Sequence, residues 1–206
     1  MSERRKFKIQ RALGLELPGL GKPGALELNP LPPGQHGGAH TRRKLSEYGL
    51  QLREKQKVLF HYGLREEQLR RFVRDARRIS PSNWIEALIG LLERRVDNIV
   101  FRAGFGRSIA SARQLVNHGH VLVNGKRLTI GSAVLRPGDT VELTEYAKGP
   151  MTEDSRQSPR LPLPEFLQFG ENNNTRATLI ALPAARHIPF AFEPQRVAEY
   201  YAQRGV

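Results

Sequence analysis

The chain has 206 residues, of which 33 are lysine or arginine and 20 are aspartate or glutamate, so its formal net charge is +13. This length suffices for one large or two small domains with a buried core, and the absence of cysteine excludes disulfides, thiolate zinc sites and a cysteine nucleophile. No stretch is long and apolar enough to predict a membrane helix or a signal peptide. The lack of cysteine favours a cytoplasmic protein, and the positive charge predicts an anionic partner.

The positive charge is concentrated toward the start of the chain. Residues 1–80 hold 18 basic and 8 acidic residues, residues 81–143 hold 8 and 5, and residues 144–206 hold 7 and 7. The net charges of these parts are therefore +10, +3 and 0. A concentrated basic region is typical of proteins that bind nucleic acid.

Residues 1–45 are predicted to form an extended basic arm. They contain five of the 14 prolines and two glycine-rich runs, at 18–24 and 32–38. Because both residue types interrupt helices, long helices are not expected here. The arm is expected to become ordered on its partner.

Apolar residues at helical spacing then predict three consecutive helices. The first follows Ser46 as its N-cap and ends before Gly63, and the third follows the break at residues 80–83 and continues to Arg95. The apolar positions of the first helix are Leu45, Tyr48, Leu52 and Leu59.

The second predicted helix has an apolar side and an arginine side. Its apolar stripe consists of Leu69, Phe72, Val73, Ala76 and Ile79. Four arginines, at positions 70, 74, 77 and 78, fall about 140° around the helix from that stripe at 100° per residue. With few acidic neighbours, these arginines would repel one another unless an anion covers them, which indicates a binding surface.

Residues 93–143 predict a compact module of a short helix followed by antiparallel strands. Ser108 is placed to cap the helix, and residues 120–123 alternate like a strand. Asn124-Gly125 is a strong hairpin signal, and a turn at residues 137–139 leads into a further strand. Polar and basic side chains gather at the start of the short helix, where free backbone amides favour phosphate.

Near the end of the chain, three prolines between positions 159 and 164 predict a loop. A strand is predicted over residues 178–182, and Pro194 is placed to begin a last helix.

Several motifs together closely resemble a known family. They are Leu92-Glu-Arg-Arg-Val-Asp-Asn98, Gly104-Phe-Gly106, Ala112-Arg-Gln-Leu-Val116, His118-Gly-His120, Val123-Asn-Gly125 and Pro137-Gly-Asp139. They are similar to the small RNA-binding module named after the fourth protein of the small ribosomal subunit, which also occurs in pseudouridine synthases and other proteins. Upstream, Pro33-Gly-Gln-His-Gly37 and residues 44–57 resemble the N-terminal domain of that ribosomal protein family itself.

The resemblance implies an α+β fold in which a small all-α helical domain carries an inserted α/β RNA-binding module with an antiparallel sheet. An extended basic N-terminal arm, residues 1–45, precedes the helical domain. The helical domain spans residues 46–92 and is completed by a C-terminal helix at 193–206. The module and its following strands occupy residues 93–192.

The resemblance also implies a function. It predicts a structural constituent of the small ribosomal subunit that binds 16S rRNA as a primary binder, organises a multi-helix junction in the 5′ domain and nucleates assembly. It further implies contact with small-subunit ribosomal protein five, an influence on translational accuracy and a place on the mRNA entry path. No membrane, cofactor or small-molecule substrate is expected. An RNA-modifying or RNA-quality-control factor with the same module is the alternative.

The candidate site residues form two groups. The candidate rRNA-binding residues are Gln35, His36, Arg53, Lys55, Lys57, Arg70, Arg74, Arg77, Arg78, Arg107, Ser108, Ser111, Arg113, Gln114 and Lys126. By resemblance, the candidates for the mRNA entry path are Arg42, Arg43 and Lys44.

An enzymatic interpretation finds no catalytic constellation. Arg95-Val-Asp97 partly resembles the motif around the catalytic aspartate of pseudouridine synthases, but the Thr-Ser-Gly that completes the motif is missing. Asp97 is therefore interpreted as a structural carboxylate that hydrogen-bonds locally or pairs with Arg94. The histidines at 36, 40, 118 and 120 lack carboxylates at metal-site spacing, so no metal is expected.

Overall fold

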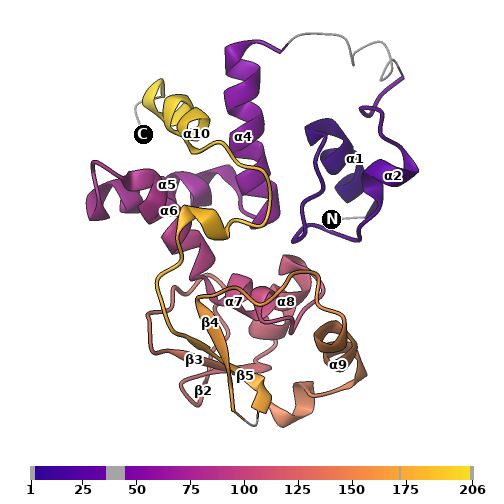
Figure 1. Ribbon diagram of the computed structural model, residues 1–206, viewed down its shortest axis with the longest axis vertical. Helices are drawn as coiled ribbons and strands as arrows, with labels where there is room; N and C mark the ends of the chain where they lie inside the picture. The colour runs from indigo at the N-terminus through magenta and orange to yellow at the C-terminus, as the bar shows by residue number, and fades with distance from the viewer. Residues whose placement is uncertain (1–2, 36–44, 172, 205–206) are drawn as a thin grey trace. The chain divides into compact units, whose positions relative to one another are not determined.

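The computed structural model describes residues 3–35, 45–171 and 173–204. The chain divides into two compact units. Unit 1 comprises residues 1–70 and 190–206, and unit 2 comprises residues 71–189. The fold is α+β: helices occur in both units, and the strands lie in unit 2 (Figure 1).

The elements of unit 1 are helices. They are α1 (Glu3–Leu13), α2 (Ala25–Leu28), α4 (Glu47–His61), the start of α5 (Glu66–Ile79) and α10 (Pro194–Ala202). The expectation of an extended arm without long helices is wrong over its first part, where α1 forms. Residues 3–13 contain neither proline nor glycine, and the helix stops just before Gly14, whose φ is +63°.

Helix α4 begins as predicted but buries a different face. Ser46 caps it by accepting a hydrogen bond from the backbone N–H of Gly49 at 3.2 Å. The expected apolar residue Tyr48 is 46% exposed, and the buried residues of the helix are Gln51, Glu54, Lys55, Val58 and His61. Most of this buried stripe is polar, so apolar periodicity did not mark it.

Helix α10 begins at Pro194 as predicted and packs against α4. The Tyr200 ring stacks on Tyr48 with centroids 6.1 Å apart, and the Gln51 amide donates to the Glu199 carboxylate at 3.0 Å. Burial raises the pKa of the Tyr201 hydroxyl above its ordinary value, and the negative charge of Glu66 adds to this shift. The hydroxyl therefore stays neutral at physiological pH.

The elements of unit 2 continue from α5. They are α6 (Trp84–Glu93), α7 (Val96–Arg102), α8 (Ile109–Asn117), β1 (Val121–Val123), β2 (Lys126–Arg127), β3 (Thr140–Leu143), the 3₁₀ turn η1 (Glu145–Ala147), α9 (Pro150–Gln157), β4 (Leu167–Gly170), β5 (Asn173–Leu179) and the 3₁₀ turn η2 (Ala185–His187). The third predicted helix ends earlier than expected, since Arg95 has extended backbone and precedes α7.

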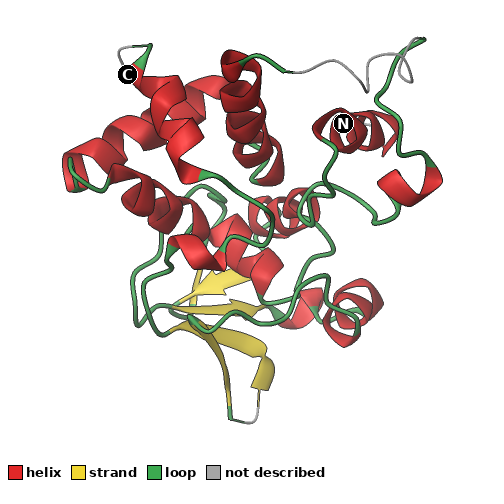
Figure 2. Ribbon diagram, turned by 45° about the horizontal axis from the view of Figure 1, so that its top comes forward, coloured by secondary structure: helices red, strands yellow, loops and turns green. Residues whose placement is uncertain are grey.

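The strands of unit 2 form one antiparallel sheet in the order β2-β1-β3-β5-β4. Helices α7 and α8 lie along one face of this sheet (Figure 2). The core between them contains Ile99 and Val116 from the helices and Val121, Val141 and Ala177 from the strands, each at most 1% exposed. The sheet therefore presents alternate residues to one helical layer.

The predicted hairpin joins β1 and β2 at Asn124-Gly125, with φ values of +50° and +76°. The Asn124 amide donates to the Asp139 carboxylate at 2.8 Å and its oxygen accepts from the backbone N–H of Thr140 at 2.9 Å. The same Asp139 caps its own turn by accepting from the N–H of Arg136 at 2.7 Å. The two predicted turns are thus bonded to each other.

The loop predicted at the prolines between 159 and 164 is present. Helix α9, which ends just before it, was not predicted; Pro150 occupies its first turn and the next proline comes only at 159. The predicted last strand has different bounds. Strand β5 ends at Leu179 rather than 182, and Ile180 and Leu182 are exposed.

No helix in the described part of the chain is long and apolar enough to cross a lipid bilayer.

Candidate nucleic-acid interface

The arginine side of α5 lies opposite its buried stripe. Leu69, Val73 and Ala76 are fully buried, as predicted, whereas the end of the stripe at Ile79 is exposed. Arg74 is exposed. The Arg78 side chain is 82% exposed, with only a loose 3.9 Å ion pair to Asp75. Arg74 and Arg78 can therefore contact an anion without breaking a strong internal contact.

The other two predicted arginines of α5 are held by neighbouring side chains. The Arg70 guanidinium lies 3.4 Å from the Glu66 carboxylate one helical turn away. The Arg77 guanidinium lies over the Trp84 ring, 4.7 Å from its centroid. These contacts orient both groups, so the four arginines are not equally available.

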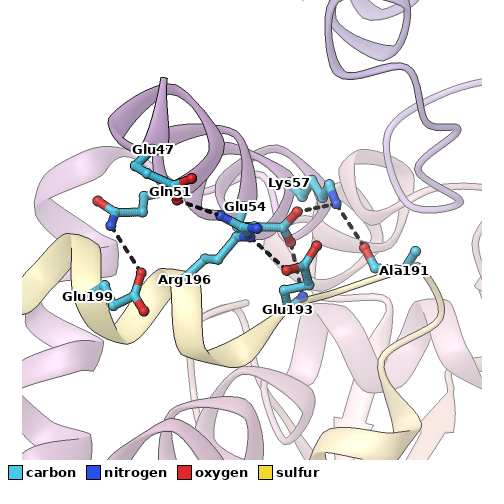
Figure 3. Close-up of polar contacts among 8 residues, drawn as sticks. All are labelled: Glu47, Gln51, Glu54, Lys57, Ala191, Glu193, Arg196 and Glu199. Carbon is cyan, nitrogen blue, oxygen red and sulfur yellow. Dashed lines mark hydrogen bonds and ion pairs between the residues drawn. The ribbon is translucent and has the colours of Figure 1, made fainter. Parts of the chain in front are cut away.

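The predicted lysines of α4 are part of the internal packing. Lys55 is buried and its ammonium lies 2.6 Å from the Glu66 carboxylate. Lys57 pairs with Glu54 at 2.5 Å and donates to the carbonyl of Ala191 at 3.1 Å, in the segment before α10 (Figure 3). Removal of either lysine would leave a carboxylate without its main partner, so both stabilise unit 1.

The predicted polar group at the start of α8 comes together in space. Ser108 caps the helix by accepting from the N–H of Ser111 at 3.2 Å. Arg107 is 58% exposed and forms an ion pair with Asp154. Side chains of Arg107, Ser111 and Gln114 line one hollow of about 450 Å³. The positive end of the α8 dipole and a guanidinium thus lie near an open hollow, an arrangement suited to a nucleotide.

Close backbone approach explains the glycine in this loop. A Cβ atom on Gly106 would lie 2.9 Å from the backbone nitrogen of Ala112. Only glycine lets the loop pass this close to α8. The position of Arg107 therefore depends on its glycine neighbour.

Arg113, also predicted to bind RNA, is tied to a buried carboxylate. Asp97 is fully buried and accepts from Arg113 at 2.7 and 2.8 Å and from Arg95 at 2.6 and 3.0 Å. The Arg95 guanidinium is itself buried and lies 5.5 Å from the centroid of the Phe72 ring. Asp97 therefore holds two cations, and Arg113 keeps only part of its surface for a ligand.

The proposed Asp97–Arg94 pair does not form. Arg94 instead donates to the backbone carbonyls of Gly90 at 3.0 Å and Leu135 at 3.3 Å. Burial lowers the pKa of the Arg94 guanidinium, and the positive charge of Arg136 lowers it further. Its role is to fasten the chain around residue 135 to α6.

The remaining predicted residues are scattered. Lys126 is exposed on β2, next to the hairpin turn, and Gln35 is exposed in a turn. Arg53 is half-buried and lines an apolar groove with Leu13 and Phe60. His36, Arg42, Arg43 and Lys44 lie outside the described residues.

A ring stack beside the hollow was missed as a binding feature. His120 stacks on Tyr146 of η1 with centroids 5.3 Å apart and planes at 21°, and His118 lies 6.1 Å from His120. The spacing of His118 and His120 is visible in the sequence, but no residue near Tyr146 in the sequence indicates that its ring lies beside His120. Among the residues that the structure describes, no cluster of three histidine, cysteine, aspartate or glutamate side chains could hold a metal ion.

Comparison with known proteins matches both parts of the chain. Residues 2–93 match the model described as the ribosomal protein S4/S9 N-terminal domain, and residues 94–141 match the S4 domain. The chain is 52% identical to the small ribosomal subunit protein uS4B of Bdellovibrio bacteriovorus over 97% of its own length and 96% of that protein. It is 48% identical to uS4 of Methylobacillus flagellatus over the same shares, and 39% identical to uS4 of Geobacillus stearothermophilus over 96% of each chain.

Proposed function

Because the chain belongs to the uS4 family of small-subunit ribosomal proteins, we propose that it is a primary binder of 16S rRNA that organises a multi-helix junction in the 5′ domain. Membership itself gives the broader role: a non-enzymatic structural constituent of the small ribosomal subunit that binds ribosomal RNA. The observation that supports the proposal is the pair of exposed cationic sites, at Arg74 and Arg78 on α5 and at Arg107 beside the start of α8.

The proposed mechanism is binding and stabilisation of RNA shape. Arginines neutralise phosphates that a helix junction brings together, and the positive end of the α8 dipole adds a fixed favourable field. Because the major groove of an RNA helix is too narrow for side chains to enter, most contacts are expected on phosphates and riboses. Stabilising the junction in this way nucleates assembly of the body of the small subunit.

The proposed domain organisation follows the sequence boundaries. A helical domain at residues 46–92 is completed by residues 193–206, and the module at 93–192 is inserted between them. The packing of α10 on α4 supports this arrangement. In this scheme each domain contacts RNA with its own set of side chains.

We expect the full chain to bind a 16S rRNA 5′-domain fragment far more tightly than an unrelated structured RNA of equal length. With about 6 to 10 phosphates neutralised, affinity should fall by several orders of magnitude between 50 and 200 mM salt. Filter binding across a salt series measures both quantities. Equal affinity for the two RNAs would contradict the proposal and leave only a general basic RNA binder.

The basic stretch at Arg42, Arg43 and Lys44 is proposed to contact incoming mRNA, and its family likeness supports this. Ribosomes with alanine at these three positions should translate a message with a stable hairpin more slowly, with an unstructured message as the control. An unchanged rate on the hairpin message would remove this role. Contact with small-subunit protein five and an influence on translational accuracy are proposed on the same family likeness.

A further inference from the structure

The hollow beside α8 has an exposed aromatic wall. Tyr146 of η1 is 87% exposed, although it is a large ring at the edge of a cavity of about 450 Å³. The His120 imidazole lies beside the Tyr146 ring with centroids 5.3 Å apart and planes at 21°, a stacked geometry. With so much of the side chain exposed, the opposite face of Tyr146 is open to a further flat group.

The rest of the lining fits the edges of a nucleotide. Gln114 and Ser111 supply amide and hydroxyl groups, and His118 and His120 supply ring nitrogens. Arg107 provides a guanidinium at the same hollow. Apolar groups come from Leu115 and its neighbours, so a planar ring can be buried while its edges meet hydrogen-bonding groups.

Charge favours an anionic occupant over an apolar peptide. Two acidic groups next in sequence to this part of the chain are paired, Asp154 with Arg107 and Glu145 with Lys148 at 2.5 Å. The chain as a whole carries +13. A flat aromatic group attached to a negatively charged backbone satisfies the ring stack and the charge together.

We propose that Tyr146, stacked on His120 beside the hollow of α8, is a platform for one unpaired RNA base. The base stacks on the open face of Tyr146, and the phosphate next to it meets Arg107. A paired base cannot bind in this way, because its faces are covered by its neighbours in the helix. This inference rests on the proposed rRNA-binding function and adds a base-contacting site to it.

Substitution of the exposed ring tests the stack directly. Tyr146→Ala should weaken binding to the 16S rRNA 5′-domain fragment by about 5- to 150-fold, the effect of losing one base–aromatic stack. The slope of affinity against salt should not change, because no phosphate contact is lost. Tyr146→Phe should bind like the wild type, since it keeps the ring. Ile130→Ala, at another exposed apolar position of unit 2, is the matched control.

A second readout reports stacking rather than affinity. The chain has a single native tryptophan, Trp84, so Tyr146→Trp adds one fluorophore at the platform. Binding of the fragment should quench the added fluorescence beyond any change in the wild type, and single-stranded oligoadenylate should do so more than duplex RNA. Equal quenching by duplex RNA, or no added quenching, would overturn the inference.

The two proposals fail in different ways. If the wild type does not prefer the fragment over unrelated RNA, the rRNA-binding proposal fails. If the wild type shows this preference and Tyr146→Ala binds as tightly, only the base platform fails. A flatter salt slope in Tyr146→Ala would also overturn it, because the residue would then act through phosphate contacts.

Discussion

Replacing the buried carboxylate Asp97 with asparagine should lower the free energy of unfolding of unit 2 by about 3–5 kcal/mol. Asp97 is fully buried and balances the charge of Arg95, which is only 3% exposed. The amide keeps the shape but not the charge, so the guanidinium of Arg95 would remain buried without a counter-ion. Since whole domains are stable by about 5–15 kcal/mol, this single change removes a large share.

Urea denaturation of the full chain measures this loss. The fluorescence of Trp84, which lies in α6, reports on unit 2. Asp75→Asn is the matched control, because its carboxylate makes only the loose 3.9 Å pair with the exposed Arg78 and should change stability by less than about 0.5 kcal/mol. Equal stability of Asp97→Asn and Asp75→Asn would show that Arg95 does not need its partner.

Removing the two exposed arginines of α5 should weaken RNA binding strongly and make it less dependent on salt. The double variant Arg74→Gln/Arg78→Gln loses two proposed phosphate contacts. Each contact contributes about 0.7 to 0.9 to the salt slope, which corresponds to a loss of roughly 25- to 60-fold in affinity at 0.1 M salt for the pair. The slope of log affinity against log salt should become shallower by about 1.4 to 1.8.

A charge-matched control separates contact from net charge. Arg186→Gln/Arg196→Gln also lowers the formal charge by two, from +13 to +11, but Arg186 pairs with Glu165 and Arg196 pairs with Glu193 and Glu47. Neither belongs to the proposed interface, so this variant should keep most of its affinity. If both double variants lose the same affinity, net charge alone attracts the RNA and α5 has no special role.

Local signals made the best predictions of fold. Ser46, Ser108 and Asn124-Gly125 act on backbone groups within a few residues, and each has the predicted structure. The average composition of residues 1–45 does not predict the first helix, because all the glycines and prolines of this segment lie beyond residue 13. Proline and glycine interrupt a helix only at their own positions in the sequence.

The buried face of α4 could not be predicted from apolar spacing. It includes Gln51, Glu54 and Lys55, whose polar groups bond to partners in α10, in the residue before α10 and in α5, respectively. A lysine in such a helix looks the same in the sequence whether it binds an anionic ligand or an internal carboxylate. For this reason the sequence alone does not separate Lys55 and Lys57 from the exposed arginines of α5.

Helical periodicity predicted the exposed cations of α5, because the direction of a side chain there depends on its own helix alone. The proposed platform at Tyr146 instead depends on residues that lie far apart in the sequence. His120 belongs to the loop before β1 and Tyr146 to the turn after β3, and only the pairing of β1 with β3 brings the two rings together. Such a site becomes visible only when strand register is known.

The contact between α4 and α10 has a consequence for the order in which the protein folds during its own synthesis. Glu199 bonds to Gln51 across 148 residues, and Arg196 bonds to Glu47 across 149. All of unit 2 is made before residue 190, whereas unit 1 receives α10 only after unit 2 has been made. Domains fold as they emerge from the N-terminus onward, and contacts between distant residues form slowly. Unit 2 can therefore complete its core on the nascent chain before α10, the last helix of unit 1, has been made.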